Sequence, residues 1–254
     1  MPQNIILDRM QPVLDSYQPP GSEFEAQREW EQTYELFSAP MGPFWTNGEL
    51  RLRRQSSAGG GCRITADCRR RGSPGFSFFV HAEFECNAGT PAPLLRWTSS
   101  SKMAAAAGDA PYLNSGLSKQ GRISGGMMEV RTGSQALRTR VHGACLAKWC
   151  LIDAIQRLPR ERGPHSFSLL DEVDEVRPGH ELRYRGEEQV AMGGGTRALG
   201  VFEHLGAGVI PASYWIDGQN RVLFVVSGVE ISVLKESNGG AASYTLRNPP
   251  VRPL

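Results

Sequence analysis

The sequence has no apolar run that approaches the roughly 18–20 residues a membrane-spanning helix needs. The stretch from Met1 to Met10 also lacks the basic segment and long apolar segment of a secretory signal. These two absences predict a cytoplasmic protein without a membrane span. The net charge is only +2, from 28 basic and 26 acidic residues, so we expect no nucleic-acid partner.

The common motifs of metal, nucleotide and nucleophile chemistry are missing as well. The 5 cysteines contain no Cys-x-x-Cys pair, and their odd number without a signal favours reduced, buried thiols. There is no Gly-x-Ser-x-Gly elbow, and no Ser/His/Asp set can be assigned. The Gly-rich segment 192–196 precedes a strand pattern, so we interpret it as a hairpin turn. The sequence therefore indicates no metal and no cofactor.

Glycine and proline are abundant, with 29 and 17 residues, which suits a fold with many turns. Segment 214–228 places aromatic and β-branched residues on both sides of the turn Asp217-Gly-Gln-Asn220, a pattern typical of a β-hairpin. Similar strand patterns recur along the chain and predict about ten or eleven strands. We expect a single domain over 1–254, mainly β (α+β), with a long curled antiparallel sheet or half-barrel around one central helix.

Two helices are predicted. An apolar stripe that includes Leu146, Trp149 and Ile155 indicates a central helix over 144–158, packed on the concave side of the sheet. A short amphipathic helix within 1–17 begins an N-terminal helical arm, residues 1–28. Residues 171–179 are acidic and loop-like, and residues 248–254 form a Pro-rich tail.

One strand carries a candidate catalytic set. His81, Glu83 and Glu85 share one face of a predicted strand, where an imidazole and two carboxylates are suited to acid–base work or metal binding. The same alternation is also typical of any half-exposed strand, and no second motif with metal-ligand spacing supports a metal site. Both interpretations stay open at this point.

Aromatic residues are spread over the predicted strands and the central helix. Their default place is the core, but a sheet that does not close fully on its helix leaves part of this surface to line an apolar cleft. The candidate ligand-binding residues are Phe78, Trp97, Trp149, Tyr184, Phe202, Tyr214 and Trp215. Adjacent Tyr214 and Trp215 must face opposite sides of their strand.

The helix from Trp149 to Leu158 and the hairpin motif Trp215-x-Asp217-x-x-x-Arg221-Val-Leu223 resemble the lipoprotein-carrier-type β half-barrel superfamily, over about residues 140–236. The resemblance implies a curved sheet that wraps helices, an apolar concavity, and ligand carriage without catalysis. Members are usually exported, whereas this sequence shows no export signal.

Three functions follow as hypotheses. The first is non-catalytic binding or carriage of an apolar or amphipathic small molecule in a half-barrel cleft. The second is an enzyme that uses the His81, Glu83 and Glu85 face, and it requires these groups to converge in a pocket. The third is a subunit of a larger assembly, with a protein partner docked through the N-terminal helix.

Overall fold

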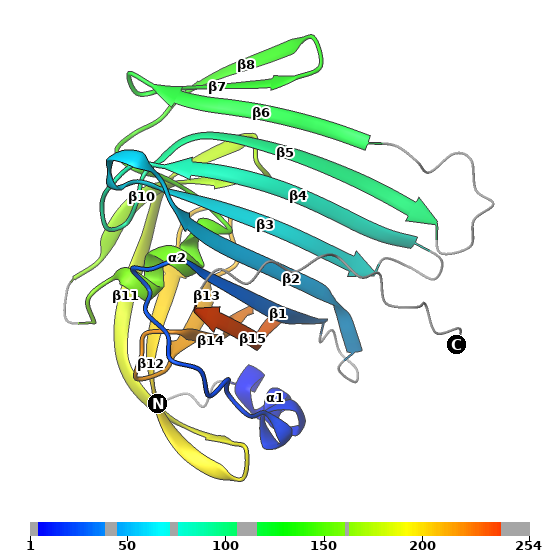
Figure 1. The fold of residues 1–254 in the computed structure, drawn as a ribbon, viewed down its shortest axis with the longest axis vertical. Helices are drawn as coiled ribbons and strands as arrows, with labels where there is room; N and C mark the ends of the chain where they lie inside the picture. The colour runs from blue at the N-terminus through cyan, green and yellow to red at the C-terminus, as the bar shows by residue number, and fades with distance from the viewer. Residues whose placement is uncertain (1–4, 39–44, 72–75, 106–115, 161–162, 240–254) are drawn as a thin grey trace.

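The computed structural model describes residues 5–38, 45–71, 76–105, 116–160 and 163–239. They form one curled antiparallel sheet with two short α-helices, as the sequence predicts, but with 15 strands rather than ten or eleven (Figure 1). The strands are β1 (Trp30–Ser38), β2 (Trp45–Ser56), β3 (Cys62–Arg71), β4 (Phe76–Cys86), β5 (Leu94–Ala105), β6 (Gly116–Ser124), β7 (Met127–Thr132), β8 (Gln135–Arg140), β9 (Cys145–Ala147), β10 (His165–Asp171), β11 (Glu175–Met192), β12 (Gly195–Leu205), β13 (Ala212–Ile216), β14 (Val222–Ser227) and β15 (Glu230–Gly239).

The chain enters the sheet at its centre. From β1 it proceeds by neighbouring strands to the edge strand β8, then passes to the opposite edge at β9 and returns by neighbouring strands to β15, which pairs with β1. Neighbouring strands are antiparallel except β9 and β10, which are parallel. The passage between the two edges uses only residues 141–144, which span at most about 19 Å.

That short connection explains the curl. A flat sheet of 15 strands would separate its edges by roughly 65–70 Å at the usual spacing between strands. The sheet must therefore bend until β8 and β9 approach each other. Contacts across the concavity support this shape, because Trp97 Nε1 donates a hydrogen bond to the Val173 carbonyl at 2.9 Å. Lys119 also forms an ion pair with Asp174 in the turn that precedes β11.

The central helix is shorter than predicted. Helix α2 (Cys150–Arg157) begins six residues later than the expected start at residue 144, because Cys145–Ala147 form strand β9 along β10. The helix lies in the concavity of the sheet (Figure 1), and its residues from Cys150 to Gln156 are buried. It therefore fills one end of the curled sheet.

The N-terminal helix α1 (Ile5–Ser16) is the helical part of the predicted arm, and the described residues 17–28 are not helical. Its Met10 and Leu14 are fully buried, and Gly193 donates a backbone hydrogen bond to the Leu14 carbonyl at 2.9 Å. The apolar side of α1 thus packs on its own chain, beside the β11–β12 turn. A protein partner for the rest of this helix stays a prediction.

One further segment differs from the sequence prediction, and one agrees with it. The acidic loop expected over 171–179 is a three-residue turn, 172–174, between β10 and a long β11. The Asp217–Asn220 turn is present as predicted, with Asn220 at a φ of 62° and Asp217 Oδ1 accepting hydrogen bonds from the backbone of Gln219 and Arg221. The predicted tail, 248–254, lies outside the described residues.

Candidate functional site

The position of α2 defines an inner face of the sheet. Arg54 of β2 lies 3.0 Å from the Asp153 carboxylate of α2, so Arg54 points inward. Directly paired residues of neighbouring strands project to the same side, and register therefore carries this assignment across the sheet. Ile64 pairs with Arg54, Phe84 with Ile64, and Trp97 with Phe84, so all of these residues point inward.

The inner face continues into the second half of the sheet. Arg70 lies six residues after Ile64 on β3 and shares its side, and the Arg70 guanidinium forms an ion pair with Glu230 of β15. Glu230 pairs with Ser227, so Ser227 of β14 also points inward. Val225 lies on the same side of β14 as Ser227 and pairs with Tyr214 of β13. The next inward partners are Phe202 and Tyr184, in contact with each other at a ring distance of 5.2 Å.

Burial changes systematically along this inner face. On β4, Phe84 and Ala82 are fully buried near α2, Val80 is half-buried, and Phe78 is 44% exposed. The same trend runs along β5 from buried Trp97 and Ser99 to half-buried Ser101 and Met103. One end of the concavity is therefore filled by α2 and side chains, and the other end is open to solvent. We call the second region the open end of the concave face.

The walls of the open end are apolar and hydroxylic. The half-buried or exposed inward residues of β4, β5, β14 and β15 there are Phe78, Val80, Ser101, Met103, Val225, Ser227 and Ser232. Its rim carries more apolar surface, because Leu117 of β6 is 46% exposed. Ile210 and Val229, in turns at the same end of the sheet, are 62% and 52% exposed.

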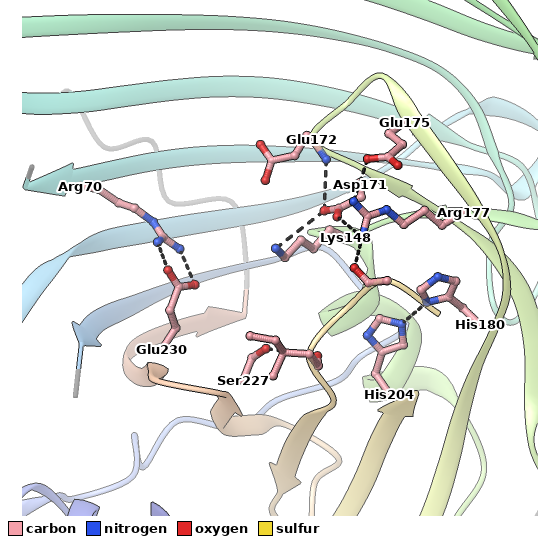
Figure 2. Close-up of polar contacts among 12 residues, drawn as sticks. Arg70, Lys148, Asp171, Glu172, Glu175, Arg177, His180, His204, Ser227 and Glu230 are labelled. Atoms are coloured by element: carbon pink, nitrogen blue, oxygen red, sulfur yellow. Dashed lines mark hydrogen bonds and ion pairs between the residues drawn. The ribbon is translucent and has the colours of Figure 1, made fainter. Parts of the chain in front are cut away.

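Charged groups lie at the same end of the concavity (Figure 2), where Arg70 is the cross-strand partner of Phe78. Arg70 and Glu230 form two hydrogen bonds, which hold the pKa of the Glu230 carboxyl below its usual value. Lys148, between β9 and α2, lies 3.8 Å from the Asp171 carboxylate, and Arg177 lies 3.5 Å from the same carboxylate. This part of the concavity is therefore polar and bears charges of both signs.

A histidine pair lies beside these charges (Figure 2). His180 Nδ1 and His204 Nε2 are 2.9 Å apart, so one ring donates a hydrogen bond to the other. Both residues are buried, and Phe167 stacks on His204 at 5.6 Å between ring centroids. Burial, with smaller contributions from the nearby His180 and Lys148, lowers the pKa of His204 to about 4, and burial also lowers the pKa of His180. The pair is therefore neutral at physiological pH.

The predicted aromatic ligand-binding residues separate into three groups. Phe78 lies at the open end. Trp97, Phe202 and Tyr214 face inward but are 5% exposed or less, while Trp149 and Tyr184 are half-buried against this core. Trp215 faces outward, as its opposition to Tyr214 predicts, and it stacks on Phe224 at 4.8 Å and donates a hydrogen bond to Glu188. The seven predicted residues therefore do not line one cleft together. Of the inward-facing ones, Phe78 is the residue that is exposed to solvent inside the concavity.

The residues His81, Glu83 and Glu85 lie on the outer face, because they alternate with inward Ala82 and Phe84. His81 bonds to Asp67 at 2.7 Å, and its side chain is 48% exposed. Glu83 and Glu85 line an outer groove of about 410 Å³, but His81 is not among its lining residues. Within the described residues, no group of His, Cys, Asp and Glu side chains has the arrangement of a metal site.

The outer groove is walled by ion pairs. Glu85 accepts hydrogen bonds from Arg63 and Arg96, and Glu129 is contacted by Arg122, Arg131 and Arg138. These pairs lower the pKa values of both carboxyls. The groove lining is strongly charged, with three carboxylates and three guanidinium groups, whereas the open end of the concave face exposes apolar side chains. The open end is therefore the stronger candidate for an apolar ligand.

Sequence reasoning missed Lys148, Arg70 and Glu230 as inward charges. The alternation of β3 places Arg70 on the same side as Ile64 and Cys68, so the sequence alone was enough to predict that Arg70 points inward. Lys148 lies inside the helix that the sequence predicted over 144–158, whereas the structure places it in the connection between β9 and α2, so the helical pattern could not show where its side chain points.

Solved structures share the fold. No family model and no curated protein matches the chain. A β-barrel-like protein of a domain of unknown function, DUF1849, from Brucella abortus superposes with a TM-score of 0.57 and 10% identity, over 84% of this chain and 98% of that one. A putative outer membrane lipoprotein-sorting protein domain from Vibrio parahaemolyticus covers 92% of this chain and 91% of that one, with 10% identity and a TM-score of 0.26, which is too low to support an argument. The chain therefore has the open, curled sheet of a β half-barrel, a fold that it shares with the Brucella abortus protein.

Proposed function

We propose that the protein binds and carries an apolar or amphipathic small molecule at the open end of its concave face. The observation that carries this proposal is the exposure of inward apolar side chains where α2 no longer fills the concavity. Phe78, at 44% exposure, points into a curved sheet rather than onto its outer surface. Covering such surface removes apolar area from water, which favours binding.

The chemistry of this region suits binding better than catalysis. An apolar wall with a few polar groups is typical of small-molecule sites. The exposed rim residues Leu117, Ile210 and Val229 extend the apolar surface to the edge of the concavity. In the part of the chain that the structure describes, no helix is long and apolar enough to cross a bilayer.

Titration with the neutral dye Nile red tests the proposal, because its fluorescence rises in an apolar site. We expect saturable binding to the wild-type protein and about fivefold weaker binding to Phe78→Ser, which removes about 1 kcal/mol of apolar contact. Phe79→Ser is the matched control, since Phe79 is the next residue of β4, is 37% exposed and points outward beside Arg69. Equal losses in both variants, or no saturable binding to the wild type, would contradict the proposal.

A further inference from the structure

Lys148 differs from the other charged groups in the concavity. Arg70 makes two hydrogen bonds with Glu230, and Arg177 bonds with Glu175 and the Gly208 carbonyl. The Lys148 ammonium has the Asp171 carboxylate at 3.8 Å, beyond hydrogen-bond distance, and makes no side-chain hydrogen bond within the described residues. Its side chain is 58% exposed. Lys148 is therefore a cation with unused donors inside the concavity.

The Asp171 carboxylate, the nearest anion to Lys148, also interacts with other groups. Asp171 is shared, because Arg177 lies 3.5 Å from it and the backbone N–H of Glu172 donates to its Oδ1 at 3.2 Å. Of the further carboxylates nearby, Glu230 is held by Arg70 and Glu175 by Arg177. An anion that entered the concavity would find three N–H donors on Lys148 without displacing either carboxylate.

Lys148 also lies within reach of the apolar wall. Phe78 is the direct cross-strand partner of Arg70, and Arg70 bonds to Glu230. The Lys148 side chain points toward the Arg70–Glu230 pair (Figure 2), and its positive charge contributes to the lowered pKa of Glu230.

We infer that the molecule bound at the open end has an anionic head group, a carboxylate or a phosphate ester, that pairs with the Lys148 ammonium while its chain lies along Phe78, Val80 and Met103. This inference rests on the proposed function. Hydrogen bonds from an ammonium to carboxylate or phosphate oxygens are charge-assisted and stronger than those between neutral groups. A neutral hydroxyl would accept a hydrogen bond from the ammonium but would lack the attraction between opposite charges, and a cationic head group would be repelled.

Displacement of Nile red by four ligands of one chain length tests the inference. Decanoate, decyl phosphate, decanol and decyltrimethylammonium are compared below their micellar concentrations, with acetate and inorganic phosphate as anions without a chain. We expect decanoate and decyl phosphate to compete about tenfold better than decanol, the effect of one or two charge-assisted hydrogen bonds. Acetate and inorganic phosphate should compete far more weakly.

The decisive variant is Lys148→Gln, with Lys148→Arg as the rescue and Lys102→Gln as the matched control. Lys102 is exposed and pairs with outward Phe79, so it lies on the other face of the sheet. Lys148→Gln should abolish the preference for anionic ligands and leave decanol unchanged, whereas Lys102→Gln should alter neither.

The two proposals fail differently. If Nile red and decanol bind but the anionic ligands have no advantage, or keep it in Lys148→Gln, the head-group inference is overturned and the proposed function stands. If inorganic phosphate competes as well as decyl phosphate, the joint recognition of head group and chain is overturned. If none of the chain-bearing ligands binds, the proposed function itself fails.

Discussion

Asp153 of α2 and Arg54 of β2 form a buried ion pair, with 3.0 Å between carboxylate and guanidinium, that fixes the helix to the sheet. Arg157 completes the group, because its Nη2 lies 2.6 Å from the other carboxylate oxygen and its Nη1 donates to the Gly89 carbonyl. Gln156 adds uncharged contacts, since its Oε1 accepts hydrogen bonds from Gln32 and from the backbone of Val222. The helix that fills one end of the concavity is thus held by polar contacts as well as by apolar packing.

Asp153→Ala should destabilise the protein strongly. The substitution leaves two buried guanidinium groups without their anion, and the loss of one partner of a buried pair costs about 3–5 kcal/mol. Urea denaturation followed by tryptophan fluorescence measures the change in free energy of unfolding. Glu25→Ala is the control, because Glu25 and Arg28 form an exposed pair that should contribute less than about 1 kcal/mol. Similar small losses in both variants would show that the Asp153 group does not hold the helix.

The His180 and His204 pair should make stability fall as the solution becomes acidic. The pKa of His204 is lowered to about 4 in the folded protein, so between pH 6.5 and 4 the unfolded chain binds a proton that the folded protein does not. Stability is therefore complete above pH 6.5 and decreases by about 3 kcal/mol toward pH 4, below which this contribution levels off.

The free energy of unfolding of wild type and His204→Gln, measured across this pH range, tests the assignment. The slope should be smaller in the variant. His81→Gln should keep the wild-type slope, because His81 is half exposed on the outer face. A slope unchanged in His204→Gln would assign the acid sensitivity to other groups.

The thiols should be protected from reagents in the folded protein. All 5 cysteines are reduced and buried, and Cys86 lies in hydrogen-bonding contact with both Cys62 and Cys150. Burial raises the pKa of Cys145 to about 12, and the contact with Cys86 together with burial raises that of Cys62. Because thiolate is the reactive form, titration with Ellman's reagent should detect almost no thiol before denaturation and 5 after it. Rapid reaction of two or more thiols without denaturant would contradict this arrangement.

Gly121 allows Trp97 to cover the inner face beside it. A Cβ built on Gly121 would lie 2.1 Å from the Trp97 ring, while one on Gly116 of the same strand would have an ordinary contact at 3.7 Å. Gly121→Ala should therefore destabilise the protein by about 1–3 kcal/mol through overpacking, and Gly116→Ala should have little effect. Thermal unfolding of the two variants provides the comparison. Equal melting temperatures would mean that the ring moves aside without cost.

The sequence predicted strands that carry a clear pattern. Strand β4 alternates between inward and outward residues, and the β13–β14 hairpin has apolar residues on both sides of a distinct turn. The boundary between β6 and β7 was harder to predict, because most residues of β6 are exposed and no apolar face marks this strand. The stretch 145–147 was assigned to the helix because it is apolar, whereas pairing with distant β10 makes it a strand.

The site was less predictable than the fold. Alternation could separate Tyr214 from Trp215, and the register then confirmed that they face opposite sides. It could not show which end of the inner face is filled, because that depends on a long-range contact between α2 and Arg54. For this reason Phe78 and Phe202, both inward aromatic residues, differ in exposure from 44% to 1%.

The chain order of the sheet also divides the molecule into two consecutive meanders. Residues of β1 to β8 form one, those of β9 to β15 form the other, and in the described sheet they are joined by the nine residue pairs of β1 and β15. Each meander is assembled from neighbours in sequence, whereas this central seam joins residues about 200 positions apart, so its closure carries the largest entropic cost of folding. We consequently expect the seam to be the last part of the sheet to form, whereas the junction at 141–144, whose backbone bonds to Gly126 and Ser168, already holds the two outer edges together.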